Sequence, residues 1–148
     1  MEPIRSNSLL TQAVQEYADF PQSFTETSAP RPKKKAQLYI LVNTSLRLSP
    51  GKVASQVGHA VEKLMKNCGK NASYKAYQSF GSAKIVLNVP TEEEFVNILD
   101  RTKHLLKVYI IDAGLTQCPR NSVTVVGYEP LFQERVPDAF KPLSLYNK

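Results

Sequence analysis

The chain has 148 residues, of which 42% are hydrophobic and 22% are charged, a balance typical of one folded domain with tails. Its formal net charge of +6 favours a polyanionic partner such as a nucleic acid, although a solvated basic surface gives the same value. The longest apolar run, residues 38–42, is far shorter than the ~20 residues of a membrane-spanning helix. The polar, acid-containing start is unlike a secretory or organellar leader. We therefore expect a cytoplasmic protein that does not enter membranes.

Residues 1–35 differ in composition from the rest because they are rich in Pro, Ser, Thr and Gln. We expect them to form a flexible extension to a domain over residues 36–148. Within the extension, Ser8 can cap a short helix. That helix is either an element that docks on the domain or on a partner, or a fluctuating turn without function. The basic run at residues 33–35 is either a nuclear address, a phosphate-binding arm or a solvated linker.

Strand and helix signals alternate after residue 36. In chain order they predict a strand at 38–42, a helix at 50–67, a short helix at 73–80, a strand at 84–89, a helix from 91 to about 104, and strands at 107–111 and 122–128. Ser49 and Pro50 are a capping residue and a proline suited to the first helical position, and Gly69 is suited to a left-handed turn after that helix. Thr91 and Glu94 form a capping box for the third helix.

This alternation predicts an α/β fold: one domain with a four-stranded, mostly parallel or mixed sheet and helices on both faces. A shorter helical or irregular tail follows the last strand, because two prolines interrupt it. Ligands in such folds bind at the carboxyl ends of the strands. Residues that directly follow the predicted strands are therefore the first candidates for chemistry.

The helix predicted at residues 50–67 has two faces. Its apolar residues recur on one side, which predicts contact with the sheet. Polar residues recur on another side at spacings of four, three and four: Lys52, Gln56, His59 and Lys63. Lys52 lies in the first turn, where a cation opposes the helix dipole, so a functional reason for it is favoured. His59 is equally consistent with a packing histidine, and Lys63 with a solvated charge.

Asp112 directly follows the strand at 107–111, and Gly114 permits a backbone geometry that presents the carboxylate at the strand's end. Asp112 is therefore either a catalytic group or a turn residue that binds neighbouring amides. Hydroxyl and amide side chains add to this region, where they can bind a ligand or satisfy the loop's own backbone: Thr116, Gln117, Ser122 and Thr124.

Metal and nucleotide chemistry are disfavoured. Cys68 and Cys118 lie far apart in the sequence, unlike closely spaced metal ligands or a disulfide framework, so we expect free thiols and no metal site. Gly51 and Lys52 suggest a phosphate-binding loop, but such a loop requires glycine and a hydroxyl residue where this chain has Leu46 and Val53.

Two blocks in this order, GKVASQVGHA at residues 51–60 and DAGLTQ at residues 112–117, resemble the class two (archaeal and eukaryotic-type) peptidyl-tRNA hydrolases. The resemblance extends over about residues 36–128. It implies that family's α/β fold and hydrolysis of the ester that joins a peptide to the 3′ ribose of a tRNA. Peptidyl-tRNA is then the partner, and no cofactor is required.

On this resemblance four residues are candidates for catalysis: Lys52, His59, Asp112 and Thr116. Asp112 would orient or deprotonate a water, and Lys52 would stabilise negative charge on the carbonyl or the terminal phosphate. Thr116 would hold substrate, and His59 would either relay a proton or brace the helix. The candidate substrate contacts are polar or cationic: Gln56, Gln117, Ser122, Thr124, Arg47 and Lys63.

The chain departs from the family pattern at two cations expected near tRNA phosphates, which are here Pro50 and Leu115. Arg47 and Arg120 can compensate for them. These departures keep an alternative function open: a non-catalytic relative that binds tRNA, or that binds a protein partner through the N-terminal extension. The sequence also leaves open whether the chain forms a homodimer.

Overall fold

The computed structural model describes residues 9, 34–112 and 121–147. The chain divides into two units, Met1–Pro30 and Arg31–Lys148, and every element discussed below belongs to the second. Apart from Leu9, the helix predicted after Ser8 lies outside the described residues. No helix in the described ranges combines the length and the apolarity needed to cross a bilayer.

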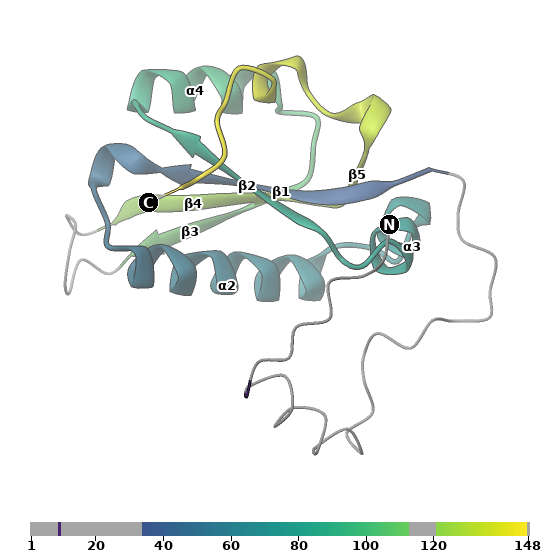
Figure 1. The fold of residues 1–148 in the computed structure, drawn as a ribbon. Coiled ribbons are helices and arrows are strands. Elements are labelled where there is room, and N and C mark those ends of the chain that lie inside the picture. Colours follow the sequence, from purple (N-terminus) through teal and green to yellow (C-terminus); the bar gives the residue numbers. More distant parts are fainter. Residues whose placement is uncertain (1–8, 10–33, 113–120, 148) are drawn as a thin grey trace. The chain divides into compact units, whose positions relative to one another are not determined.

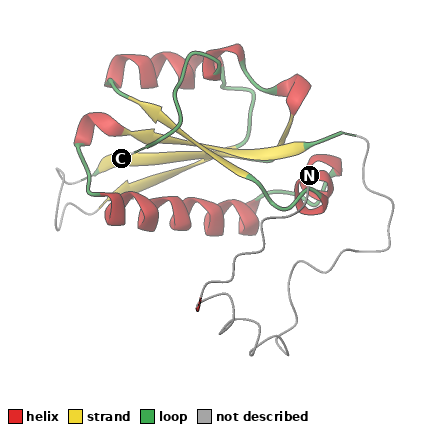
Figure 2. Ribbon diagram, in the orientation of Figure 1, coloured by secondary structure: helices red, strands yellow, loops and turns green. Residues whose placement is uncertain are grey.

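A mixed sheet forms the middle layer of the fold (Figure 2). Four strands follow the order β2-β1-β4-β3: β1 (Ala36–Asn43), β2 (Lys84–Val89), β3 (Lys107–Asp112) and β4 (Ser122–Tyr128). β1 is parallel to β2 and antiparallel to β4, which is in turn antiparallel to β3. The short β5 (Leu131–Phe132) adds to the start of β1. The carboxyl ends of β1, β2 and β3 therefore share one edge of the sheet.

Helices cover both faces of this sheet, as predicted. α2 (Pro50–Asn67) lies along one face and α4 (Glu92–Arg101) lies on the other (Figure 1). The shorter α3 (Ala72–Ser79) contributes Ala76 and Tyr77 to the same buried cluster as α2. The irregular segments include three 3-10 turns: η1 (Thr44–Leu46), η2 (Gln133–Arg135) and η3 (Asp138–Phe140). The α/β prediction with a mixed sheet is confirmed.

The predicted helix starts are confirmed by their capping bonds. The backbone N–H of Lys52 donates to Ser49 Oγ at 3.3 Å, and Pro50 opens α2. The backbone N–H of Glu94 donates to Thr91 Oγ1 at 3.2 Å. These bonds satisfy amides that have no partner inside the helix.

Two helix ends differ from the prediction. α2 ends at Asn67, and the next residue, Cys68, is extended (φ −81°, ψ 143°), so the left-handed turn predicted at Gly69 is wrong. The Asn67 side chain donates to the Lys63 carbonyl at 2.9 Å, which satisfies a carbonyl of the last turn without a left-handed residue. α4 ends at Arg101, because Thr102 Oγ1 donates to the Ile98 carbonyl at 2.8 Å.

The α4 side of the sheet has a core centred on Tyr128, which is fully buried. Its hydroxyl and Thr102 Oγ1 are 2.8 Å apart, and the Phe140 ring packs edge-on at 5.0 Å between centroids. Burial raises the pKa of Tyr128 to about 12.

The other side of β4 sets how closely α2 approaches the sheet. A Cβ placed on Gly127 would lie 2.9 Å from Leu64 Cδ1 and 3.4 Å from Ala60 Cβ. Leu64 and Ala60 are both fully buried, so neither can move away into solvent. The absence of a side chain at residue 127 therefore allows α2 to lie close to β4. The same position brings the polar face of α2 close to β3.

We predict that Gly127→Ala lowers the free energy of unfolding by about 1–3 kcal/mol, because the added methyl group overpacks this contact. Urea denaturation of the purified chain measures the effect. Gly58→Ala is the matched control, since Gly58 lies within α2, is exposed and has room for a methyl group, with no atom within 4 Å. The control should be stabilising by up to about 1 kcal/mol. Equal stability of Gly127→Ala and the parent chain would contradict this account of the packing.

Candidate active site

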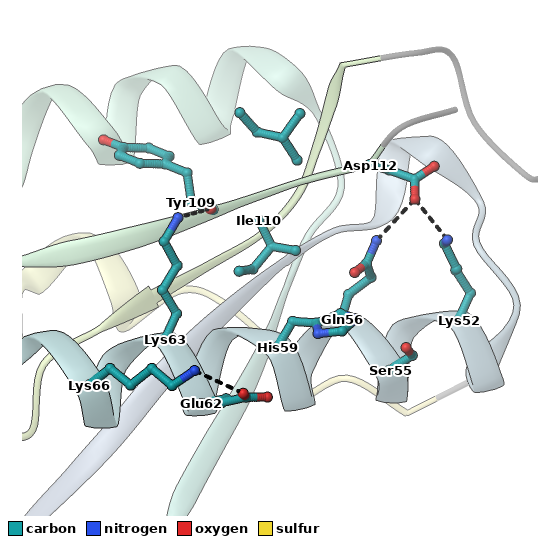
Figure 3. A pocket seen from close by; sticks show the side chains of 11 residues that line it. Lys52, Ser55, Gln56, His59, Glu62, Lys63, Lys66, Tyr109, Ile110 and Asp112 are labelled. Carbon is teal, nitrogen blue, oxygen red and sulfur yellow. Dashed lines mark hydrogen bonds and ion pairs between the residues drawn. The ribbon is translucent and has the colours of Figure 1, made fainter. Parts of the chain in front are cut away.

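A groove with a volume of about 560 Å³ runs between α2 and the edge strand β3. Its α2 wall contains the polar face predicted from the sequence, Lys52, Gln56, His59 and Lys63, and three further side chains: Ser55, Glu62 and Lys66. Figure 3 shows Lys52, Gln56 and Lys63 reaching from this helix toward β3, whereas Lys66 lies along the helix toward Glu62. The groove ends at Asp112, the last residue of β3.

Three side chains meet at this end of the groove (Figure 3). Lys52 Nζ lies 2.7 Å from Asp112 Oδ1, and Gln56 Nε2 lies 3.4 Å from the same oxygen. The side chains of Lys52 and Asp112 are 22% and 9% exposed, and Gln56 is buried. A charge-assisted bond in this partly dehydrated setting is stronger than a surface ion pair. The structure thus brings the two sequence blocks together at Lys52 and Asp112.

The alternation of β3 explains why Asp112 reaches α2. Val108, Ile110 and Asp112 are buried, whereas Tyr109 and Ile111 between them are exposed. Since successive side chains of a strand point to opposite faces, Asp112 continues the apolar row that packs against α2. The carboxylate also places negative charge beside the first turn of α2, which offsets the unfavourable position of Lys52 in the helix dipole.

A β-bulge in β4 lies beside this carboxylate. Ile110 pairs with Val125 and Ile111 pairs with Val123, so Thr124 is the extra residue. Thr124 is fully buried, and its Oγ1 donates to the Ile110 carbonyl at 3.1 Å. The structure therefore places Thr124 inside the sheet and away from the groove lining. Bulges commonly re-aim strand ends next to functional sites.

Ser122 lies opposite Asp112 in the register of β3 and β4. The adjacent Asn121 has a left-handed backbone (φ 65°), and its N–H donates to the Asp112 carbonyl at 2.9 Å. Asn121, just before β4, thus fixes the backbone of Asp112. Lys52 and Gln56 of α2 hold its side chain. Thr116, Gln117 and Arg120 lie outside the described residues, as does Leu115.

His59 and Lys63 lie further along the groove. His59 is exposed and lines the groove, so it is not a packing histidine. Lys63 Nζ donates to the Tyr109 carbonyl at 3.3 Å, on the outer edge of β3. Lys66 pairs with Glu62 at 3.2 Å, and both side chains remain more than half exposed. The groove thus presents Lys63 and the Lys66–Glu62 pair along its length and a partly buried carboxylate at its end.

Arg47, like Thr124, is a predicted substrate contact that does not line this groove. It lies in a left-handed conformation (φ 52°) after η1 and lines a second cavity near the start of α2. Conversely, the sequence reasoning missed three residues of α2 that line the groove: Ser55, Glu62 and Lys66. The signal for Ser55 and Lys66 was present, because Ser55 lies three residues after Lys52 and Lys66 lies three after Lys63 on the same helical face.

The described residues show no group of three or more His, Cys, Asp or Glu side chains that could hold a metal ion. Cys68 is a half-buried free thiol, whose pKa is raised by burial, and Cys118 lies outside the described residues. What the groove offers is acid–base and electrostatic chemistry. A carboxylate can accept a proton from water, and an adjacent ammonium can stabilise developing negative charge.

Comparison with known proteins gives matches to one family. A family model described as Peptidyl-tRNA hydrolase PTH2 matches residues 36–146. "Peptidyl-tRNA hydrolase 2, mitochondrial" of Mus musculus is 32% identical over 126 residues, which cover 82% of this chain and 70% of that protein. "Peptidyl-tRNA hydrolase" of Metallosphaera sedula is 30% identical over 100 residues, which cover 64% of this chain and 86% of that protein.

"Probable peptidyl-tRNA hydrolase 2" of Dictyostelium discoideum is 32% identical over 113 residues, which cover 72% of this chain and 53% of that protein. The chain thus spans about half the length of this relative. The fold and the groove define an α/β protein with a lysine–aspartate pair at the carboxyl edge of its sheet. With the family match over most of its length, the chain belongs to the peptidyl-tRNA hydrolase PTH2 family.

We predict that Lys52→Met lowers the free energy of unfolding by about 1–3 kcal/mol, because it leaves the Asp112 carboxylate buried without this cation. Lys103→Met is the matched control. Lys103 pairs with Asp100 at 2.8 Å, but those side chains are 79% and 66% exposed, so its loss should leave stability essentially unchanged. Urea denaturation at neutral pH checks both. Equal effects of the two substitutions would show that the Lys52–Asp112 pair behaves as an ordinary surface pair.

Proposed function

We propose that the chain is a peptidyl-tRNA hydrolase, which cleaves the ester between an N-blocked aminoacyl or peptidyl group and the 3′ ribose of tRNA and so recycles tRNA. The observation that carries this proposal is the contact between Lys52 and Asp112 at 2.7 Å, at the end of a cationic groove. The names of the Mus musculus and Metallosphaera sedula relatives support the same reaction.

The proposed chemistry uses the two charged groups in different steps. Asp112 accepts a proton from a water whose oxygen attacks the ester carbonyl carbon, and Lys52 stabilises the oxyanion that forms on the carbonyl oxygen. Gln56 holds the Asp112 carboxylate through its Nε2. The carbon–oxygen bond to the ribose then breaks, and the ribose oxygen takes a proton from Asp112 or His59. Thr116, Gln117 and Ser122 remain proposed substrate contacts.

The nucleic acid would follow the lysines of the groove. Lys63 and Lys66 follow His59 along the groove-lining side of α2, and phosphates gain affinity when lysines displace their counterions. The net charge of the whole chain, +6, is also positive, as suits a protein that binds a polyanion. Thr124 would act indirectly, because its bond to Ile110 shapes the bulge beside Asp112.

Further features of the chain remain proposals. We propose that residues 1–35 form an extension to the domain at residues 36–148, and that they offer a site for a protein partner. Assembly into a homodimer is a separate proposal, tested by the solution mass. A cytoplasmic location is a further proposal, whereas the name of the Mus musculus relative places that protein in mitochondria. Imaging of the tagged chain in its own cell distinguishes the two.

We predict that the purified chain hydrolyses N-acetyl-phenylalanyl-tRNA, and that Asp112→Asn lowers kcat/KM by about 10²- to 10⁴-fold, because water loses its proton acceptor. Asp100→Asn is the matched control, since Asp100 forms a similar contact with Lys103 next to the end of α4 and should keep full activity. Circular dichroism establishes that both variants fold.

The opposite result has a specific meaning. If the parent chain binds tRNA but shows no turnover, the alternative of a non-catalytic relative is correct. If the parent chain is active and Asp112→Asn is equally active, the chain is a hydrolase whose active site lies elsewhere.

A further inference from the structure

A second cavity, with a volume of about 680 Å³, opens at the same edge of the sheet as the groove. The ends of β1 and β2 form its floor, and η1 and the start of α2 form one wall. Pro50 and Val53 of α2 line this cavity, whereas Lys52 between them lines the groove. The two spaces therefore lie on either side of the first turn of α2. The volume is in the range of cavities that bind small organic groups.

The C-terminal segment builds the opposite wall. The N–H of Asn88 donates to the Ser144 carbonyl at 2.8 Å, and the N–H of Tyr146 donates to the Val86 carbonyl at 2.9 Å. Leu145 between them forms an antiparallel bridge with Leu87. The segment thus runs along the outer edge of β2 like a further strand. Tyr146 lines the cavity, while Leu145 is 62% exposed.

The two spaces differ in charge. Three lysines line the groove beside the carboxylates of Glu62 and Asp112, whereas Arg47 is the one charged residue among the described residues that line the second cavity. The rest of that lining is apolar or carries neutral hydrogen-bonding groups, including Asn88, Tyr146 and Asn147. A polyanion gains affinity from several cations, so the nucleic acid is matched to the groove. The second cavity is matched to a ligand of amides and apolar atoms.

Arg47 and Asn88 are well placed to bind such a ligand. The backbone of Arg47 has a φ of 52°, in the left-handed region. This conformation is energetically costly for a residue with a side chain, and residues that adopt it are enriched at functional sites. It forms no ion pair with the described residues. Asn88 Oδ1 accepts a hydrogen bond from Thr44 Oγ1, which fixes the amide, and no described residue accepts from its Nδ2. Both side chains can donate to peptide carbonyls.

We propose that this cavity binds the peptidyl part of the substrate, while the tRNA end lies in the lysine groove. The inference rests on the proposed function, because it assigns the two sides of the scissile ester to the two sides of the first turn of α2. Lys52 and Asp112 then lie where the two parts of the substrate join. Donors directed at backbone carbonyls suit an enzyme that must accept many peptides, since those carbonyls are common to all of them.

The test is a binding experiment that does not require turnover. Affinity of the full chain is measured for uncharged tRNA and for tRNA that carries N-acetyl-phenylalanine through an uncleavable amide. We expect the acyl group to tighten binding about tenfold. Arg47→Gly should remove this gain without weakening the binding of uncharged tRNA. Because glycine accepts a φ of 52° without strain, this variant should fold. Tyr146→Ala should act in the same direction.

Controls separate the two spaces. Ser82→Gly is the control for Arg47→Gly, because it also replaces a residue with a left-handed backbone (φ 54°). Leu145→Ala is the control for Tyr146→Ala, because it truncates the exposed neighbour of Tyr146. Both controls should keep the gain in affinity from the acyl group. Lys63→Met should weaken the binding of both RNAs equally.

The inference is overturned if the parent chain binds both RNAs equally, or if Arg47→Gly keeps the gain from the acyl group. It is also overturned if Arg47→Gly weakens the binding of uncharged tRNA as much as the binding of acylated tRNA, since the cavity would then bind RNA. Ester hydrolysis is measured separately on the parent chain. Absence of turnover with an intact, Arg47-dependent gain contradicts the proposed activity and supports the cavity assignment.

Discussion

The ion pair between Lys52 and Asp112 joins two parts of the fold that are 60 residues apart in sequence. It forms because α2 lies close to the sheet, and that approach depends on the missing side chain at Gly127 opposite Leu64. The same approach turns the polar face of α2 toward β3 and creates the groove. Removing one charge would leave the other without its charged partner in a partly dehydrated site, which is costly. Packing and site chemistry are therefore coupled through one contact.

The carboxyl edge of the sheet concentrates the functional features of this chain. β1, β2 and β3 all end there, and the first turn of α2 divides that edge into a groove lined by three lysines and two carboxylates and a cavity lined by a single charged residue, Arg47. This division matches a substrate with a polyanionic part and an amide-rich part on either side of one ester. In the proposed mechanism, the N-terminal turn of α2 is both a wall between two binding spaces and the source of the catalytic lysine.

Much of this arrangement was predictable from the sequence, because local signals and the final fold agree. Ser49, Pro50 and Thr91 are capping signals that act within a few residues, and the spacing of Lys52, Gln56 and His59 places them on one helical face. Contacts between distant segments were not predictable in this way. The bulge at Thr124 depends on how β3 and β4 pair, and the wall formed by Tyr146 depends on an edge pairing with β2. Gly69 failed as a signal because the Asn67 side chain satisfies the helix end.

The most direct test of the central claim is a double-mutant cycle on kcat/KM for N-acetyl-phenylalanyl-tRNA, with Lys52→Met, Asp112→Asn and the two combined. If the two residues act as one catalytic unit, the double variant should lose about as much activity as the less active of the single variants, because groups that act together are not additive. If the two losses instead multiply, the residues act independently, and the account of a single lysine–aspartate site would be wrong.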